Sequence, residues 1–266
     1  MRNVFITTVA AMAISTAAFA DQTLVMGPAL SGSIELDFAE NTATNKVEAT
    51  STLGLDVATG NGLAFGGFNF ESVDGATLAL DQYHVGVVIG AATVSYGDQG
   101  GIFPTAIAAT AFDALNDPNA AMTESVQVSA MGASVAVGLT DVTTDVSDIA
   151  NLQAAYTFST AAVDLTAAVD YNKTTEKYIW GGRAAADVAG TAAGVTATYA
   201  AEVMAFEVDA TVMGVTAYMN GDENDATQNI GAEWTKGWDN LTLTADANYN
   251  FDSSDVTPGL NLSFNF

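Results

Sequence analysis

The eight residues Gly259 to Phe266 read G-L-N-L-S-F-N-F, and their side chains alternate between apolar and polar. Leu260, Leu262, Phe264 and Phe266 form one set, and asparagine and serine form the other. Successive side chains of a β-strand point to opposite faces, so this segment predicts a strand with one apolar and one polar face. Such strands are typical of β-barrels that lie in a membrane.

The same alternation recurs along the chain in segments of about ten residues, the length that a tilted strand needs to cross the hydrocarbon layer. Residues 241–251 have apolar odd positions and polar even positions, residues 163–171 depart from this pattern only at Ala168, and residues 47–57 repeat it. After residue 20 no apolar run is long enough for a transmembrane helix. We therefore predict an all-β chain that forms a transmembrane antiparallel β-barrel.

The alternation predicts about sixteen strands, and fourteen are also compatible with it. The expected strands lie near 30–38, 45–58, 62–73, 76–89, 92–98, 122–130, 133–141, 148–158, 162–171, 175–188, 192–201, 204–212, 215–220, 227–236, 240–251 and 257–266. Tight turns follow the even-numbered strands and mostly longer links follow the odd ones, as in single-chain outer-membrane barrels. The links at Asp74-Gly75 and Glu202-Val203 are too short for this rule. The last strand is expected to close the barrel against the first, near Ser31 to Phe38.

Aromatic residues give a second indication, because the girdles of a membrane barrel require them near strand ends. Many of them fall near the ends of the expected strands, with Val, Leu and Ala between them. Those expected at the long-loop end are Phe38, Tyr96, Tyr171, Tyr178, Trp180, Tyr199, Tyr249 and Phe251; those expected at the short-turn end are Tyr156, Phe158, Trp234, Trp238, Phe264 and Phe266.

Residues 1–20 have the parts of an export signal: Arg2, an apolar stretch from Val4 to Ala18, and a small-x-small site at Ala18-Phe19-Ala20. The apolar stretch is too short to span a bilayer as a helix. We therefore expect residues 1–20 to be a signal peptide and residues 21–266 to be the barrel. The expected location is the cell outer membrane.

The composition excludes several classes of function. The chain has 6 basic and 31 acidic residues, and its formal net charge is −25. Such a surface repels nucleic acid. The absence of cysteine excludes disulfides, thiolate metal sites and cysteine nucleophiles.

One connection is much longer than the others, from Gln99 to Ala121. A connection of this length inside a compact fold is usually functional. It contains apolar residues, among them Phe103 and Ile107, that are poorly suited to open water. We expect this loop, which follows the fifth strand, to fold into the barrel.

In two stretches the chain resembles the general porins of Gram-negative bacteria, in particular the alphaproteobacterial type. One runs from Tyr83-His84-Val85-Gly86-Val87 to Thr93-Val94-Ser95-Tyr96-Gly97-Asp98, like the strand, turn and strand before the family's constriction loop. The other is the last strand, whose Phe264 and Phe266 would carry the signal for insertion by the barrel-assembly machinery. The resemblance implies a water-filled channel for passive diffusion of ions and small hydrophilic solutes, surrounded by outer-membrane lipid and lipopolysaccharide. It also implies association of three barrels into a homotrimer.

The chain departs from this family in its arginines, since Arg183 is the only one after residue 20. A ladder of arginines opposite the loop is therefore impossible. The acidic candidates for the pore constriction are Asp98, Asp113, Asp117 and Glu124, and the basic or polar candidates for the pore wall are Lys46, His84, Lys177 and Arg183. For the charged candidates, ordinary solvation in a polar lumen or loop is the competing interpretation. Rings of charged side chains select ions in channels, so the acidic excess predicts cation preference.

Metal binding and catalysis find little support in the sequence. Asp222, Glu223 and Asp225 offer oxygen ligands suited to Ca²⁺, but their spacing does not match the twelve-residue calcium loop. No cofactor is expected. His84 is the only histidine, and no G-x-S-x-G or phosphate-loop motif is present, so we expect no enzymatic activity.

Two alternatives of another class remain open at this stage. One is a non-enzymatic surface or structural β-protein, such as an adhesin-like protein or a barrel with a plugged lumen and no open pore. The other is a β-solenoid, but its interior would be apolar, whereas here one face carries Asp, Thr, Asn and Lys throughout, and no fixed repeat is visible.

Overall fold

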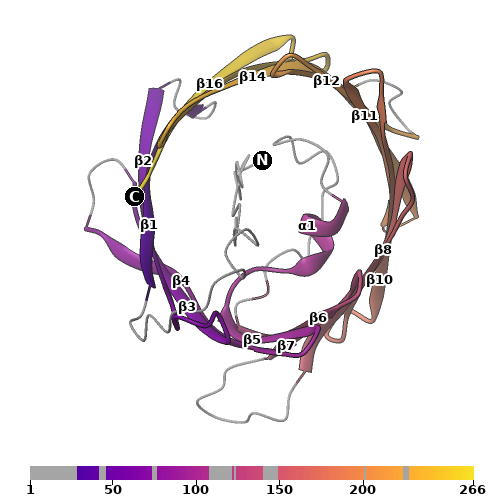
Figure 1. The fold of residues 1–266 in the computed structure, drawn as a ribbon. Coiled ribbons are helices and arrows are strands. Elements are labelled where there is room, and N and C mark those ends of the chain that lie inside the picture. Colours follow the sequence, from indigo (N-terminus) through magenta and orange to yellow (C-terminus); the bar gives the residue numbers. More distant parts are fainter. Residues whose placement is uncertain are drawn as a thin grey trace.

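The structure is a computed structural model that describes residues 29–41, 46–73, 77–107, 122, 124–139, 149–200, 202–223 and 228–266. These residues form a closed antiparallel barrel of sixteen strands and one short helix (Figure 1). The strands are β1 (Ala29–Asn41), β2 (Lys46–Ala58), β3 (Ala64–Val73), β4 (Ala79–Ile89), β5 (Ala92–Asp98), β6 (Glu124–Ala130), β7 (Ala133–Leu139), β8 (Ile149–Ser159), β9 (Val163–Asn172), β10 (Lys177–Val188), β11 (Thr191–Ala200), β12 (Val203–Val212), β13 (Val215–Asp222), β14 (Asn229–Trp238), β15 (Leu241–Asn250) and β16 (Asp255–Asn265). The predicted fold class and strand number are confirmed. The predicted signal peptide lies outside the described residues.

Each strand pairs with its neighbours in the sequence, and β16 pairs with β1 to close the ring. In this last pair Asn265 lies opposite Ser33 and Leu260 lies opposite Phe38. The backbone of Phe266 exchanges two hydrogen bonds with Gly32, of 2.9 and 3.0 Å. Closure leaves no strand edge unpaired, so the predicted pairing of the last strand with the first is confirmed.

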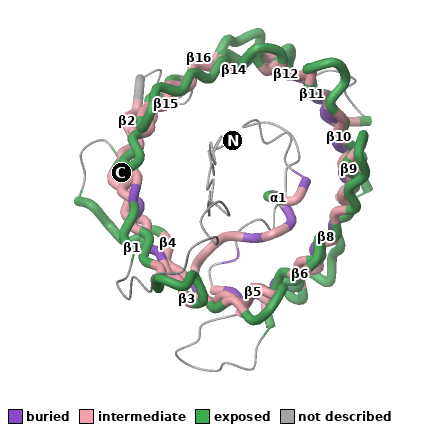
Figure 2. Tube along the Cα trace, viewed as in Figure 1, coloured by how far each residue is buried: buried purple, intermediate pink, exposed green. Residues whose placement is uncertain are grey.

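The alternation of side chains separates the two faces of the wall. Leu165 and Trp180 on the outer face are half exposed, whereas Gln153 and Asp170 on the inner face are fully buried. Figure 2 shows exposed positions around the whole ring. The outer face is apolar and the inner face is polar, as in barrels that hold a water-filled lumen within a membrane.

Three of the predicted tight turns are two-residue hairpins that end in glycine. Met131-Gly132, Ala189-Gly190 and Met213-Gly214 connect β6 to β7, β10 to β11 and β12 to β13, and both residues of each turn have positive φ. Turns of this kind match the twist of the flanking strands, and glycine adopts positive φ at little cost.

The wall is not equally tall all round. Strands β5, β6 and β7 have seven residues each, whereas β8 has 11 and β1 has 13. Two register shifts, between Asn69 and Phe70 and between Gly138 and Leu139, lie close to this shorter section. Among the described residues, no helix is both long and apolar enough to span a membrane.

Candidate functional site: the lumen beside helix α1

Helix α1 (Ile102–Ile107) lies inside the barrel, in the first part of the long connection after β5 (Figure 1). It contacts the inner wall of β7 to β10. The inward fold of this loop, expected from its apolar residues, is confirmed for its described part. The helix therefore lies against one side of the barrel interior.

Apolar packing holds α1 against the wall. Phe103 and Ile107 are each 1% exposed and form one cluster with Ala168 and Ile179. Gly181 leaves the space that this packing needs, because a Cβ there would lie 2.5 Å from Cδ1 of Ile107 and 3.0 Å from Cζ of Phe103. Burial of these two side chains against the wall removes them from the lumen.

The wall also binds the start of α1 through a hydrogen bond from a buried side chain. The backbone N–H of Phe103 donates to Oε1 of Gln153 at 3.0 Å. Nε2 of Gln153 in turn donates to Oδ2 of Asp170 at 3.2 Å. Gln153 is thus fixed in orientation by Asp170, and it supplies an acceptor to one of the N–H groups that the first turn of a helix leaves without an internal partner.

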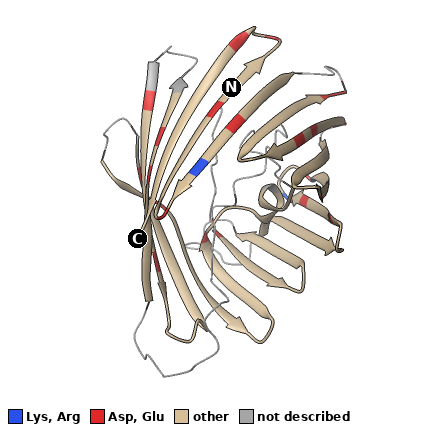
Figure 3. Cartoon of the chain, turned by 45° about the horizontal axis from the view of Figure 1, so that its top comes forward, with Lys and Arg blue, Asp and Glu red and all other residues tan. Residues whose placement is uncertain are grey.

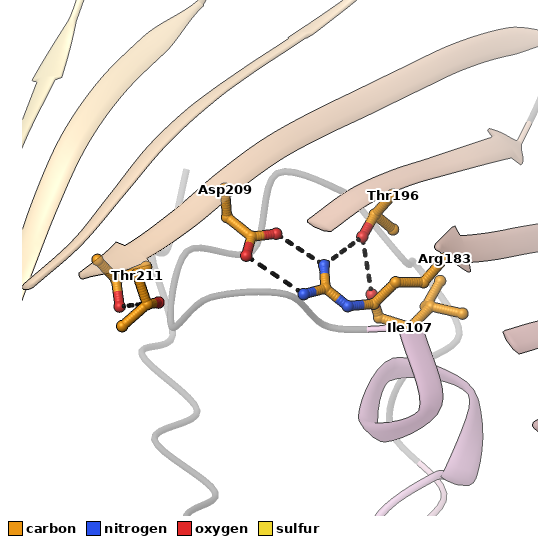
Figure 4. A network of polar contacts seen from close by, with 6 residues as sticks. Ile107, Arg183, Thr196, Asp209 and Thr211 are labelled. Carbon is orange, nitrogen blue, oxygen red and sulfur yellow. Dashed lines mark hydrogen bonds and ion pairs between the residues drawn. The ribbon is translucent and has the colours of Figure 1, made fainter. Parts of the chain in front are cut away.

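The end of α1 is bound through a second chain of contacts (Figure 4). Oγ1 of Thr196 donates to the backbone carbonyl of Ile107 at 3.3 Å and accepts from Nη1 of Arg183 at 3.0 Å. Arg183 makes two further hydrogen bonds, of 2.8 and 3.3 Å, to the two carboxylate oxygens of Asp209. A bidentate pair of this kind is strong and geometrically specific.

The wall across the lumen from α1 is acidic. Strand β1 is eight places from β9 in the closed order of sixteen (9 − 1 = 8), so β1 lies directly opposite the strand that α1 contacts. The acidic residues at inward positions of β1, β14 and β15 on that side are Glu35, Asp37, Glu233 and Asp246, whereas Glu207 and Asp209 lie inward on β12, nearer to α1. Glu233 and Asp246 are direct cross-strand partners. Figure 3 shows acidic residues on several strands of the wall and few basic ones.

Amide side chains line the same wall beside these acids. Nδ2 of Asn229 donates to Oδ1 of Asn220 at 2.9 Å, and Oδ1 of Asn229 accepts from Nδ2 of Asn250 at 2.8 Å. Asn261 donates to the carboxylate of Glu35. This hydrogen-bonded row ties β13, β14 and β15 together across the inner face.

The structure corrects the predicted positions of two acidic residues. Ser125 and Gly97 are cross-strand partners on the inner face. Glu124, which precedes Ser125, and Asp98, which follows Gly97, therefore lie on the outer face. Glu124 accepts hydrogen bonds from the hydroxyls of Tyr83, at 2.8 Å, and Tyr96, at 3.3 Å. Their closeness to the loop in the sequence suggested the constriction, but the alternation of the strand turns them outward. Asp113 and Asp117 lie outside the described residues.

The candidates for the pore wall fall in different places. Arg183 lies at the end of α1, in its ion pair, whereas Lys177 lies exposed at the loop-side end of β10. His84 occupies an inward position of β4, its ring 5.8 Å from that of Phe65. Lys46 is the first residue of β2, and its side chain lies outside the described part.

The two C-terminal phenylalanines lie on the outer face of the barrel, and their ring centroids are 6.5 Å apart. Of the three calcium candidates, Asp222 accepts a hydrogen bond from Gln228 at 2.8 Å, Glu223 follows it, and Asp225 lies outside the described residues. No group of three or more His, Cys, Asp or Glu within the described chain is arranged to hold a metal ion.

Sequence reasoning did not single out Gln153, Thr196, Asp209 or the acidic residues of the opposite wall. The alternation could have assigned each of them to the inner face. It could not show which of them α1 would contact, because these partners lie between 50 and 89 residues from the helix in the sequence.

Comparison with solved structures identifies the fold of this barrel. A mutant of Rh. blastica porin has a TM-score of 0.62 and 15% identity, over 90% of this chain and 100% of that one. The fold is that of the outer-membrane porins. A loop-deletion mutant of OmpT, an outer membrane protein of Vibrio cholerae, has a TM-score of 0.62 and 14% identity, over 90% of this chain and 99% of that one. Pseudomonas putida OprB has a TM-score of 0.61 and 16% identity, over 91% and 93%. No family model matches the chain, and neither does any curated protein.

Proposed function

We propose that the protein is an outer-membrane porin: a water-filled pore for passive diffusion of ions and small hydrophilic solutes, with a preference for cations. The porin fold and the polar inner face support the pore. Helix α1 contacts the wall of β7 to β11, away from the acidic residues of β1, β14 and β15. No chemical step is assigned to His84 or to any other residue, and no cofactor.

The single observation that carries the cation preference is the charge of the inner wall. Opposite α1 this wall presents Glu35, Asp37, Glu233 and Asp246. Arg183, the one arginine after residue 20, is neutralised by Asp209 rather than facing the lumen as a free cation. A lumen lined by carboxylates raises the local concentration of cations and lowers that of anions.

The reversal potential of the refolded protein in a planar bilayer under a KCl gradient tests this proposal. The sign expected is the one that indicates cation preference. A reversal potential of the opposite sign would overturn the selectivity and leave the pore intact. A folded, inserted barrel that carries no current would overturn the pore and support a plugged structural barrel.

We further propose that residues 1–20 direct export, and that the last strand, with Phe264 and Phe266, is read by the barrel-assembly machinery. The surroundings would be outer-membrane lipid and lipopolysaccharide, and the assembled form a homotrimer. N-terminal sequencing of protein recovered from an outer-membrane fraction tests the first part, with Asp21 as the expected first residue.

A further inference from the structure

The inner wall of β13 to β15 carries a group of asparagines that the proposed cation preference does not use. Asn220, Asn229 and Asn250 are cross-strand partners on three successive strands, and Asn248 lies two residues before Asn250 on β15. We call these four residues the asparagine row. Asn220, Asn229 and Asn248 are more than nine-tenths buried, so their amide groups depend on partners other than bulk water.

A backbone group fixes which way the amides of the row point. The N–H of Ser253 donates to Oδ1 of Asn250 at 2.9 Å, so Nδ2 is the atom that Asn250 directs at Asn229. This Nδ2 donates to Oδ1 of Asn229 at 2.8 Å, and Nδ2 of Asn229 donates in turn to Oδ1 of Asn220 at 2.9 Å. The order cannot be reversed, because a backbone N–H donates and never accepts.

The row ends in one unused donor and one unused acceptor. Nδ2 of Asn248 donates to Oδ1 of Asn229 at 3.4 Å, which leaves Oδ1 of Asn248. Within the described part of the chain, neither this oxygen nor Nδ2 of Asn220 has a hydrogen-bond partner, and both atoms are buried. Buried polar groups without a partner are rare in natural proteins, so two of them in one network indicate a site that a bound molecule completes.

The surroundings of the row select the kind of molecule. Glu207 is the cross-strand partner of Asn220, and Glu233 and Asp246 form the next inward pair toward the turns. These carboxylates repel an anion. A cation has no use for Nδ2 of Asn220, which is a donor only. A hydroxyl group both donates and accepts, so a neutral solute with several hydroxyl groups suits both unused atoms.

Tyr218 lies beside the row, over a glycine of the neighbouring strand. A Cβ on Gly231 would lie 2.3 Å from both Cζ and the hydroxyl oxygen of Tyr218, so the end of this side chain occupies the space that a larger residue would fill. Gly231 is the cross-strand partner of Asn248. The Tyr218 hydroxyl therefore lies across β14, on the side of the row where the unused acceptor is.

We propose that the asparagine row is a binding site in the pore for neutral hydroxylated solutes, the class to which sugars belong. Nδ2 of Asn220 donates to one hydroxyl group of the solute, and Oδ1 of Asn248 accepts from another. Rotation of the Tyr218 side chain admits the solute from the lumen. The site adds a solute class to the function proposed above, and it rests on that function only for access from water.

Two neutral probes of similar size test the site in a planar bilayer. Glucose carries several hydroxyl groups, whereas triethylene glycol carries two and otherwise offers only ether acceptors. We expect glucose to reduce the conductance of the pore in a saturable manner and triethylene glycol to reduce it in proportion to concentration. Equal, non-saturable effects of the two probes would overturn the site and leave the pore standing.

A matched pair of substitutions locates the site. Asn220→Asp removes the unused donor and keeps the oxygen that accepts from Asn229. Asn69→Asp makes the same change at an inward asparagine of β3, whose Nδ2 donates to Gln82 at 3.4 Å. At about pH 8, well above the ordinary pKa of a carboxyl group, we expect the half-saturating glucose concentration to rise roughly three- to tenfold in Asn220→Asp, the effect of one hydrogen bond, and to stay unchanged in Asn69→Asp. The same response in both variants would contradict the assignment.

A second variant and measurement do not depend on conduction. Asn248→Ala removes the unused acceptor, while Asn229 keeps the hydrogen bond from Asn250. In saturation-transfer NMR of the refolded barrel in detergent, we expect a glucose signal with the wild type and a several-fold weaker one with Asn248→Ala, both shown to be folded by their heat-dependent gel shift. A wild-type barrel without a glucose signal would overturn the site. One that binds glucose but carries no current would contradict the proposed pore and support the site.

Discussion

Arg183 and Asp209 form a bidentate ion pair in the inner wall, with N–O distances of 2.8 and 3.3 Å, and the pair binds the end of α1 through Thr196. The two side chains are only 16% and 7% exposed. A nearly buried pair contributes little net charge to the lumen. The contacts of Arg183 are therefore with the wall and, through Thr196, with the end of α1.

Removing one member of this pair should destabilise the barrel. Arg183→Met leaves the Asp209 carboxylate nearly buried without its partner, which costs about 3–5 kcal/mol in buried pairs. We expect a loss of about 3 kcal/mol in the free energy of unfolding, measured by urea denaturation in vesicles. The double variant Arg183→Met, Asp209→Leu should recover part of it. A loss below about 1 kcal/mol would show that the pair contributes no more to stability than an exposed salt bridge.

Neutralising the acidic wall should weaken cation preference. A unit charge about 4–8 Å from an ion contributes about 0.5–1 kcal/mol in water, or about two- to sixfold in relative permeability. We expect Glu233→Gln with Asp246→Asn, which removes two such charges, to lower the cation-to-anion permeability ratio by at least that factor in dilute KCl. The control is Asp239→Asn with Asp252→Asn, which removes two charges from the exposed turns at the two ends of β15. An equal effect in the control would assign the preference to total charge.

Salt concentration should change the preference in a defined direction. The Debye length is about 30 Å at 0.01 M and about 3 Å at 1 M. Fixed carboxylates on the wall therefore act across the lumen in dilute salt but not in concentrated salt. We expect the permeability ratio to fall toward one between these concentrations. A ratio that does not change would point to a local binding site for ions rather than the field of the wall.

The packing of α1 against the wall can be tested at two neighbouring glycines. A side chain at Gly181 would collide with Ile107 and Phe103, whereas one at Gly182, on the outer face, meets nothing nearer than the carbonyl of Thr166 at 3.6 Å. We expect Gly181→Val to increase open-channel noise and to speed amide exchange in residues 101–107. Gly182→Val should behave as wild type. Unchanged exchange in Gly181→Val would show that the loop does not depend on this packing.

Closure of the barrel can be tested at Gly32. A Cβ there would lie 2.6 Å from Cζ of Phe266 and 2.6 Å from the carbonyl oxygen of Gly54. Crowding of this kind typically costs about 1–3 kcal/mol. We expect Gly32→Val to lower the yield of refolded barrel, measured by the heat-dependent shift on a detergent gel. Gly237→Val, where the added Cβ meets no atom within 4 Å, is the control.

The alternation in residues such as 241–251 predicted where strands lie and which of their faces is apolar, because period two is a local property of an extended chain. It also contained the outward orientation of Glu124, since Val126 and Val128 share its parity. The nearness of Glu124 to the long loop in the sequence instead favours a place at the constriction. The strand register decides between the two, because it pairs Ser125 with Gly97 on the inner face and leaves Glu124 on the outer face.

By itself, then, the sequence determined a barrel of about sixteen strands with a polar inner and an apolar outer face, closed between residues near Ser31 and the G-L-N-L-S-F-N-F segment. Only the tertiary structure decided that Gln153 and Thr196 bind the two ends of α1, and that Arg183 is paired with Asp209. The physical reason is distance along the chain. Alternation assigns a side chain to a face, whereas barrel closure and strand register decide which distant side chains meet on it.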